Sequence, residues 1–121
     1  MGLDMYAHHT AEKITKQVDF RTKEDSEFFY WRKHPNLHGW MQQLYKERGG
    51  SDPDFNCHSL LLEPRDIDAL EKAVKGNALP FTEGFFFGES VPEDKEDDLQ
   101  FIKAARDAHA KGLNVFYFAW W

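Results

Sequence analysis

Two segments of this sequence are apolar on both sides when extended, and they limit the folds that the chain can adopt. Residues 85–87 are three consecutive phenylalanines between glycines, and residues 114–121 read NVFYFAWW. Successive side chains of a strand point to opposite faces of its sheet, so both faces must be covered at each segment. We therefore expect both segments to be neighbouring central strands.

Three further segments have strand character. Residues 3–9 alternate between apolar and polar side chains, residues 27–33 are rich in aromatic residues, and residues 58–62 are apolar. Alternation with period two predicts a half-buried strand, and aromatic residues favour strands. The expected strands are residues 3–9, 27–33, 58–62, 84–88 and 114–120.

Helical periodicity separates these strands. In residues 35–48, Leu37, Trp40, Met41 and Leu44 follow the spacing i, i+3, i+4, i+7, which places them on one helix face. Pro35 suits a first helical position. The same pattern predicts helices at residues 64–75 and 92–111.

These elements predict a single α+β domain over residues 1–121, with a mixed or antiparallel sheet of about five strands and three helices mainly on one face. The side chains expected in its core are Trp40, Leu44, Leu70, Ile102 and Phe118. Three helices can cover only one face of such a sheet. The other face needs the polar segment 10–26, which has a possible short hairpin near residues 17–21, or else a partner subunit or a ligand.

The negative charge is concentrated in one segment. The formal net charge is −6, and residues 89–98 carry six acidic residues and one lysine, which is −5 of that total. Acidic residues favour the start of a helix, and this segment precedes and enters the third helix. A surface that imitates DNA phosphates is the alternative. Lysines and arginines are not clustered, so we expect no direct binding to nucleic acid.

The composition favours an intracellular protein outside the membrane. No apolar run approaches the roughly 20 residues that span a bilayer. Cys57 is the only cysteine, so it forms no internal disulfide, which suits a reducing compartment. We expect a cytoplasmic location.

Familiar catalytic and metal-binding patterns are missing from the sequence. His34 and His38 are four residues apart, but Pro35 makes His34 a helix cap, and we expect neither a metal nor a cofactor. Cys57 lies in FNCHSL, which has no nucleophile signature, so a small buried residue at a strand start is the simpler interpretation. No Ser/His/Asp arrangement is visible.

Polar side chains on two expected strands form the strongest candidate site. Asp4, Tyr6 and His8 share one face of the first strand, and Tyr30 and Arg32 share a face of the second. If the strands are neighbours, these groups converge and could bind a small polar or anionic ligand. A water-facing sheet surface is the alternative. The candidate ligand-binding residues, with His38 added, are Asp4, Tyr6, His8, Tyr30, Arg32 and His38.

Four sequence blocks carry a resemblance to a known family. The start MGLDMY, then YWRK followed by LHGW, then LP before GFFFG, and the aromatic end resemble a family of small uncharacterised bacteriophage and bacterial proteins. The resemblance covers the whole chain and implies a phage-type accessory protein. Relatives sometimes carry a phosphoglycerate kinase label, but this sequence has no phosphate-binding loop and is too short for two substrate-closing domains. Many relatives end in Tyr-x-Ser-Trp, whereas this chain ends FAWW.

We therefore expect a non-enzymatic binding module that acts through a protein partner. A small enzyme or small-ligand-binding protein that uses the polar sheet face is the alternative. The aromatic content also predicts a homodimer whose interface includes aromatic residues of segment 27–31 or of the C-terminal strand.

Overall fold

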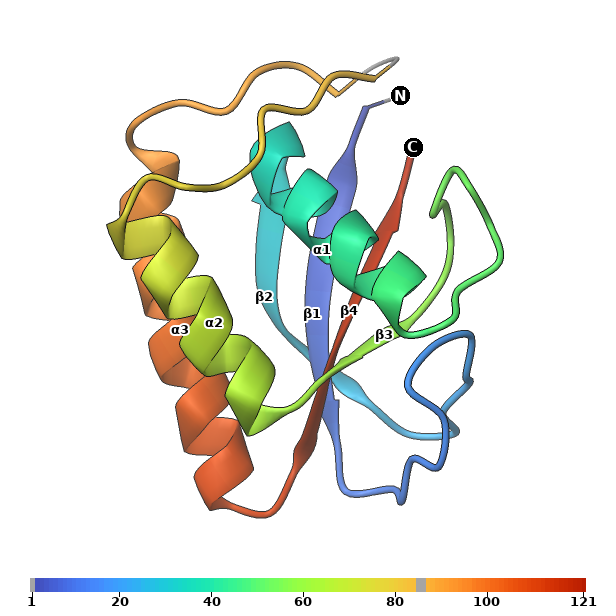
Figure 1. Cartoon of the computed structure of the whole chain (residues 1–121). Coiled ribbons are helices and arrows are strands. Elements are labelled where there is room, and N and C mark those ends of the chain that lie inside the picture. The colour runs from blue at the N-terminus through green and yellow to red at the C-terminus, as the bar shows by residue number, and fades with distance from the viewer. Residues whose placement is uncertain (1, 85–86) are drawn as a thin grey trace.

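The structure, a computed structural model, describes residues 2–84 and 87–121. Its elements are, in chain order, β1 (Asp4–Thr10), β2 (Ser26–Arg32), α1 (Pro35–Glu47), β3 (Leu60–Leu62), α2 (Pro64–Lys75), α3 (Asp94–Ala110) and β4 (Asn114–Trp120). The strands of the described residues form one antiparallel sheet in the order β2-β1-β4-β3 (Figure 1). The predicted α+β class is confirmed, with four strands rather than about five.

The predicted strand at residues 84–88 is absent from the described part of the sheet. Phe85 and Phe86 lie outside the described residues, and Gly84, Phe87 and Gly88 have no regular secondary structure. Gly88 has φ +72°, a left-handed conformation that a strand does not use. Phe87 turns into the core and is 6% exposed. The chain therefore buries this ring without adding a strand.

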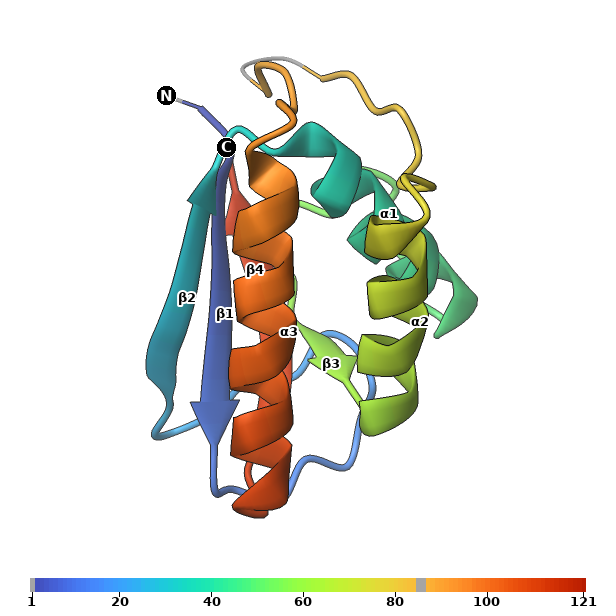
Figure 2. The same ribbon diagram turned by 90° about the vertical axis from the view of Figure 1, so that its left-hand side faces the viewer.

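The helices pack on one face of the sheet (Figure 2). The alternation in β1 has the predicted effect, because Leu3, Met5 and Ala7 are fully buried while Asp4 and Tyr6 are only partly buried. The inner face of β4 consists of Val115, Tyr117 and Ala119. The hydrophobic core lies between these strands and the helices.

Three of the five expected core residues are confirmed. Leu44, Leu70 and Ile102 are buried, but Trp40 and Phe118 are only partly buried. Trp40 lies at the margin of the buried stripe of α1. Phe118 points away from the helices, because its neighbours on β4 occupy the inward positions.

The helix boundaries follow the sequence closely. His34 is the N-cap of α1 and Pro35 is its first residue, as predicted. α3 begins at Asp94 rather than near residue 92, and its first turn is acidic, with Asp94, Glu96 and Asp97. The acidic segment therefore starts a helix.

Residues 11–25 run along the free side of β3 instead of forming a hairpin of their own. The Leu61 N–H donates to Gln17 O at 2.9 Å, and the Asp19 N–H donates to Ser59 O at 3.0 Å. The segment then returns to β2 (Figure 1), and Phe20 meets the Phe116 ring edge-on at 5.3 Å between centroids. It supplies part of the cover of the sheet face opposite the helices.

Candidate functional site

The sheet register brings four of the predicted site residues together. Asp4 lies opposite Arg32 and Tyr6 lies opposite Tyr30 in the β1–β2 pair. The Tyr30 hydroxyl donates to Asp4 Oδ1 at 2.5 Å, and Arg32 Nε lies 3.7 Å from the same oxygen. The hydrogen bond to Asp4, with desolvation as a smaller cause, raises the pKa of Tyr30 to about 12.

Strand β4 adds two aromatic side chains to this face. Trp120 lies opposite Asp4 and Phe118 lies opposite Tyr6. The Trp120 Nε1–H donates to the Tyr6 hydroxyl at 3.3 Å. Tyr30 is 46% exposed and Trp120 is 47% exposed, so large rings are presented to solvent. We call this surface the aromatic sheet face; it consists of Asp4, Tyr6, Tyr30, Arg32, Phe118 and Trp120.

His8 lies on the same side of the sheet but contacts the 11–25 segment instead. Its ring stacks on Phe116 with centroids 5.1 Å apart. Its Nδ1 lies 3.0 Å from Asp25 Oδ1, which is an ion-pair distance without the alignment of a hydrogen bond. His8 is therefore at the covered end of the face.

His38 lies on the opposite side of the sheet, inside the core. It is 1% exposed, its Nδ1 is 2.7 Å from the Tyr117 hydroxyl, and its ring stacks on Phe55. Desolvation lowers the pKa of His38 from 6.5 to about 4, so the ring is neutral at pH 7. The sequence groups His38 with the sheet-face residues only because it is a polar side chain. The structure places it on the other side of the sheet.

Cys57 differs from its predicted place. It is exposed, has φ +66°, and precedes β3, which begins at Leu60. The adjacent His58 binds carboxylates, with Nδ1 2.6 Å from Asp19 Oδ1 and Nε2 2.9 Å from Asp52 Oδ2. The prediction of a buried cysteine is wrong, because the loop before β3 turns this side chain outward.

The described residues also form a network that the sequence did not predict. The ring of His34, at the start of α1, has Nδ1 2.6 Å from Ser90 Oγ and Nε2 2.9 Å from Asp98 Oδ2. The Trp31 Nε1–H donates to Asp98 Oδ1 at 3.2 Å. His34 is 3% exposed and Asp98 is 1% exposed. Ser90 and Asp98 lie 56 and 64 positions from His34 in the chain, so no local motif could have identified them.

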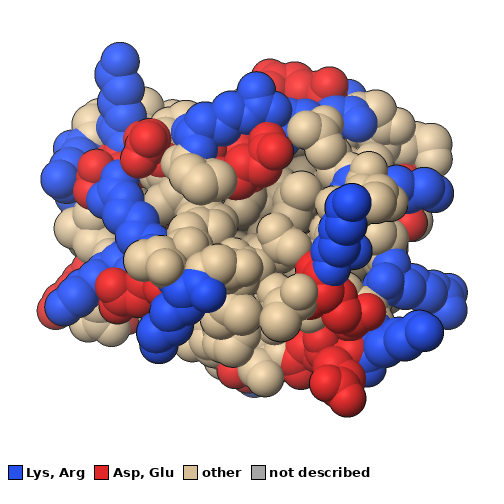
Figure 3. All heavy atoms as spheres, turned by 90° about the horizontal axis from the view of Figure 1, so that it is seen from below, with Lys and Arg blue, Asp and Glu red and all other residues tan. Residues whose placement is uncertain are grey.

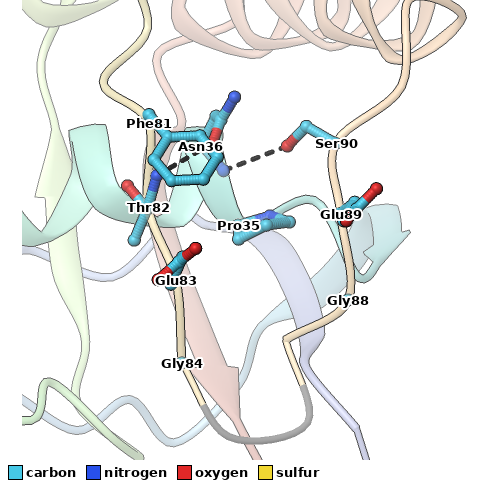
Figure 4. Close-up of a pocket in the computed structure, with 9 residues that line it drawn as sticks. All are labelled: Pro35, Asn36, Phe81, Thr82, Glu83, Gly84, Gly88, Glu89 and Ser90. Carbon is cyan, nitrogen blue, oxygen red and sulfur yellow. Dashed lines mark hydrogen bonds between the residues drawn. The ribbon is translucent and has the colours of Figure 1, made fainter.

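Ser90 also lines a cleft of about 820 Å3 beside the start of α1. Figure 4 shows the Ser90 hydroxyl directed toward the α1 backbone, between segments 81–84 and 88–90. The Asn36 N–H donates to Ser90 Oγ at 3.1 Å, and Asn36 Oδ1 accepts from the Thr82 N–H at 3.0 Å. Two hydrogen bonds thus join these segments to the first turn of α1.

At the lower end of the molecule, lysine and arginine are interspersed with aspartate and glutamate (Figure 3). Across residues 2–84 and 87–121, no group of three or more His, Cys, Asp or Glu side chains is arranged to hold a metal ion. Within the same ranges, no helix combines the length and apolar character that a membrane crossing requires.

Comparisons with protein-family models, with curated proteins and with solved structures found no match to this chain.

Proposed function

We propose that this chain is a binding module that acts through a protein partner docked on the aromatic sheet face. The exposed Tyr30 and Trp120 rings are the observation that carries the proposal. Tyrosine, tryptophan and arginine are the residues most enriched at energetically important positions of protein interfaces. The motif resemblance favours a phage-type accessory protein, and the lone Cys57 suits the cytoplasm.

The polar groups of this face support a protein partner over a small ligand. Asp4 already accepts from Tyr30 and lies near Arg32, and the Tyr6 hydroxyl accepts from Trp120. Groups that bind one another offer few free donors and acceptors to a small molecule. They leave the exposed rings as the main contact area, which fits a broad protein surface.

The backbone of β2 offers a second element of recognition. The Lys33 N–H donates to Leu3 O at 2.8 Å, one step beyond the Asp4–Arg32 pair. Hydrogen-bonded pairs alternate in an antiparallel ladder, so Trp31 also bonds β1 while the backbone groups of Tyr30 and Arg32 point to the free edge. Among the described strands, none pairs with that edge. An extended segment can add to it and lay its side chains beside the aromatic sheet face.

A second copy of the chain is the occupant that we propose for this edge. Antiparallel pairing of two β2 strands about a two-fold axis at Tyr30 places Tyr30 opposite Tyr30 of the second copy, and an aromatic pair across two strands is favourable. Trp31 is 4% exposed and the Phe28 ring stacks on Phe101 in the core. The predicted contribution of segment 27–31 to the interface therefore comes from Tyr30.

Light scattering tests the dimer. We expect twice the 14.2 kDa mass of one chain. Tyr30→Pro should return the mass to one chain, because it removes an outward N–H without breaking a backbone hydrogen bond to β1. Lys103→Ala, on the exposed side of α3, is the matched control and should leave the dimer intact. A mass of one chain at every concentration would exclude the second copy as the partner.

A further inference from the structure

The Ser90–His34–Asp98 network lies on the helix side of the sheet, apart from the surface assigned above to partner binding. Its three residues come from segment 87–90, the N-cap of α1 and the first turns of α3. A hydroxyl, an imidazole and a buried carboxylate in series form the arrangement that activates a serine nucleophile.

The partners of Asp98 determine which nitrogen of His34 carries the proton. One carboxylate oxygen accepts from the Trp31 Nε1–H, and the other lies against His34 Nε2. A carboxylate accepts, so in the neutral ring the proton is on Nε2 and the Nδ1 lone pair accepts from the Ser90 hydroxyl. Nδ1 is therefore in position to take the serine proton.

A second carboxylate lies beside His34, where a positive charge would form after the ring takes the serine proton. Asp94 Oδ2 lies 3.5 Å from His34 Nδ1. When Nδ1 takes a proton, the imidazolium has Asp94 on one side and Asp98 on the other. Both carboxylates lie within ion-pair distance of the ring, so their negative charges attract the imidazolium.

Ser90 is the member of the network that lines the 820 Å3 cleft. Ser90 is only half-buried and lines the cleft, whereas His34 and Asp98 are almost completely buried. The Asn36 N–H fixes the position of Ser90 Oγ. The Asn36 side chain uses its Oδ1 for the Thr82 N–H, which leaves its NH2 group to donate to a ligand.

The charge of the cleft indicates the substrate class. Glu83 and Glu89 line its two sides, together with Asn36, Thr82 and Ser90 (Figure 4). Two carboxylates favour a ligand with a positive charge. We propose that Ser90 is a nucleophile that hydrolyses carboxylic esters carrying a cationic group, with His34 as its general base and Asp98 as the positioning residue.

The reaction has two steps, acylation of Ser90 and hydrolysis of the acyl-serine. Ser90 Oγ attacks the carbonyl carbon while His34 Nδ1 takes its proton, and the ester C–O bond breaks as that proton passes to the leaving alcohol. Water then gives a proton to Nδ1 and attacks the acyl-serine carbon. The carboxylic acid leaves, and Ser90 regains its proton.

Covalent labelling of the full chain with a fluorophosphonate probe tests the nucleophile. Ser90 Oγ forms the bond to phosphorus and fluoride leaves, so peptide mapping should find the adduct on Ser90. A folded wild-type protein with no adduct on Ser90 would overturn the proposal without the need for any variant. Ser90→Ala should lose the adduct, and its circular dichroism should show a folded chain.

Asp98→Asn tests the positioning role. The introduced amide would donate to Nε2, which places the ring proton on Nδ1 and removes the base that faces Ser90. We expect the labelling rate to fall by at least roughly tenfold and its pH dependence to flatten. A rate and pH profile equal to those of the wild type would contradict the assignment, because a role in folding alone would not change the profile.

A pair of esters tests the substrate class. We expect a nitrophenyl ester with a quaternary ammonium group to be hydrolysed with a lower KM than its neutral isostere. Glu83→Gln and Glu89→Gln should raise KM for the cationic ester by a larger factor than KM for the neutral ester. Equal KM values for both esters in the wild type would refute the cationic substrate class.

Discussion

Acid should destabilise the protein through His38, because this ring is buried as a neutral group. Its pKa falls from 6.5 to about 4 on folding, so the unfolded chain binds the extra proton between these two pH values. The stability contribution is complete above pH 6.5 and decreases as the pH falls to about 4. At about 1.36 kcal/mol per pKa unit, the loss across this window is about 3 kcal/mol.

Urea unfolding of the wild type and of His38→Gln across this pH window measures the effect. The introduced glutamine cannot ionise but can accept from the Tyr117 hydroxyl, so the variant keeps a polar partner there. The difference in unfolding free energy between the two proteins should change by about 3 kcal/mol between pH 6.5 and 4. A difference that is independent of pH would show that His38 is not buried in its neutral form.

Three further perturbations test separate parts of the structure. Gly39→Ala places a methyl group into the Thr82 side chain, so it should destabilise the protein by about 1–3 kcal/mol in chemical unfolding; unchanged stability would contradict the docking of the 79–84 loop on α1. Asp4→Asn removes the carboxylate that holds the Tyr30 proton, so ultraviolet titration should show the phenol pKa falling from about 12 toward 10. An unchanged value would argue against the Asp4–Tyr30 hydrogen bond. Arg48→Met leaves the buried Asp66 without its two-bond partner and should cost about 2–3 kcal/mol, whereas Arg106→Met, at an exposed pair with Glu71, should have a much smaller effect; equal losses would contradict the difference in burial.

Sequence patterns predicted the strands and helices whose formation depends on residues close together in the chain. The alternation in β1 predicts both its buried side and its polar side, since period two leaves no other arrangement of a half-buried strand. The apolar stripe of α1 predicts Leu37, Met41 and Leu44 as buried, and Pro35 predicts its first residue. These features need no knowledge of the rest of the chain.

The features that depend on tertiary contacts could not be predicted. His38 is polar in sequence, but the packing of α1 against β4 encloses it beside Tyr117 and Phe55. Asp98 belongs to an acidic segment that looks solvated in the sequence, yet it is buried because α3 docks against Trp31 and His34. The Asp4–Arg32 and Tyr6–Tyr30 pairs form whenever their two strands are neighbours. The sequence could therefore predict that these side chains converge, because it predicted both strands and the faces of their side chains.

A photo-crosslinking amino acid at position 30 or 120 tests most directly whether the aromatic sheet face is the docking surface. The same group at position 103, on the exposed side of α3, is the control. After irradiation in host-cell lysate, we predict one defined polypeptide adduct from positions 30 and 120 and none from position 103. Mass spectrometry then identifies that polypeptide as a second copy of the chain or as another protein, and the purified partner should lose affinity for Trp120→Ala. Adducts that form equally at all three positions, or at position 103 alone, would contradict the assignment of this face.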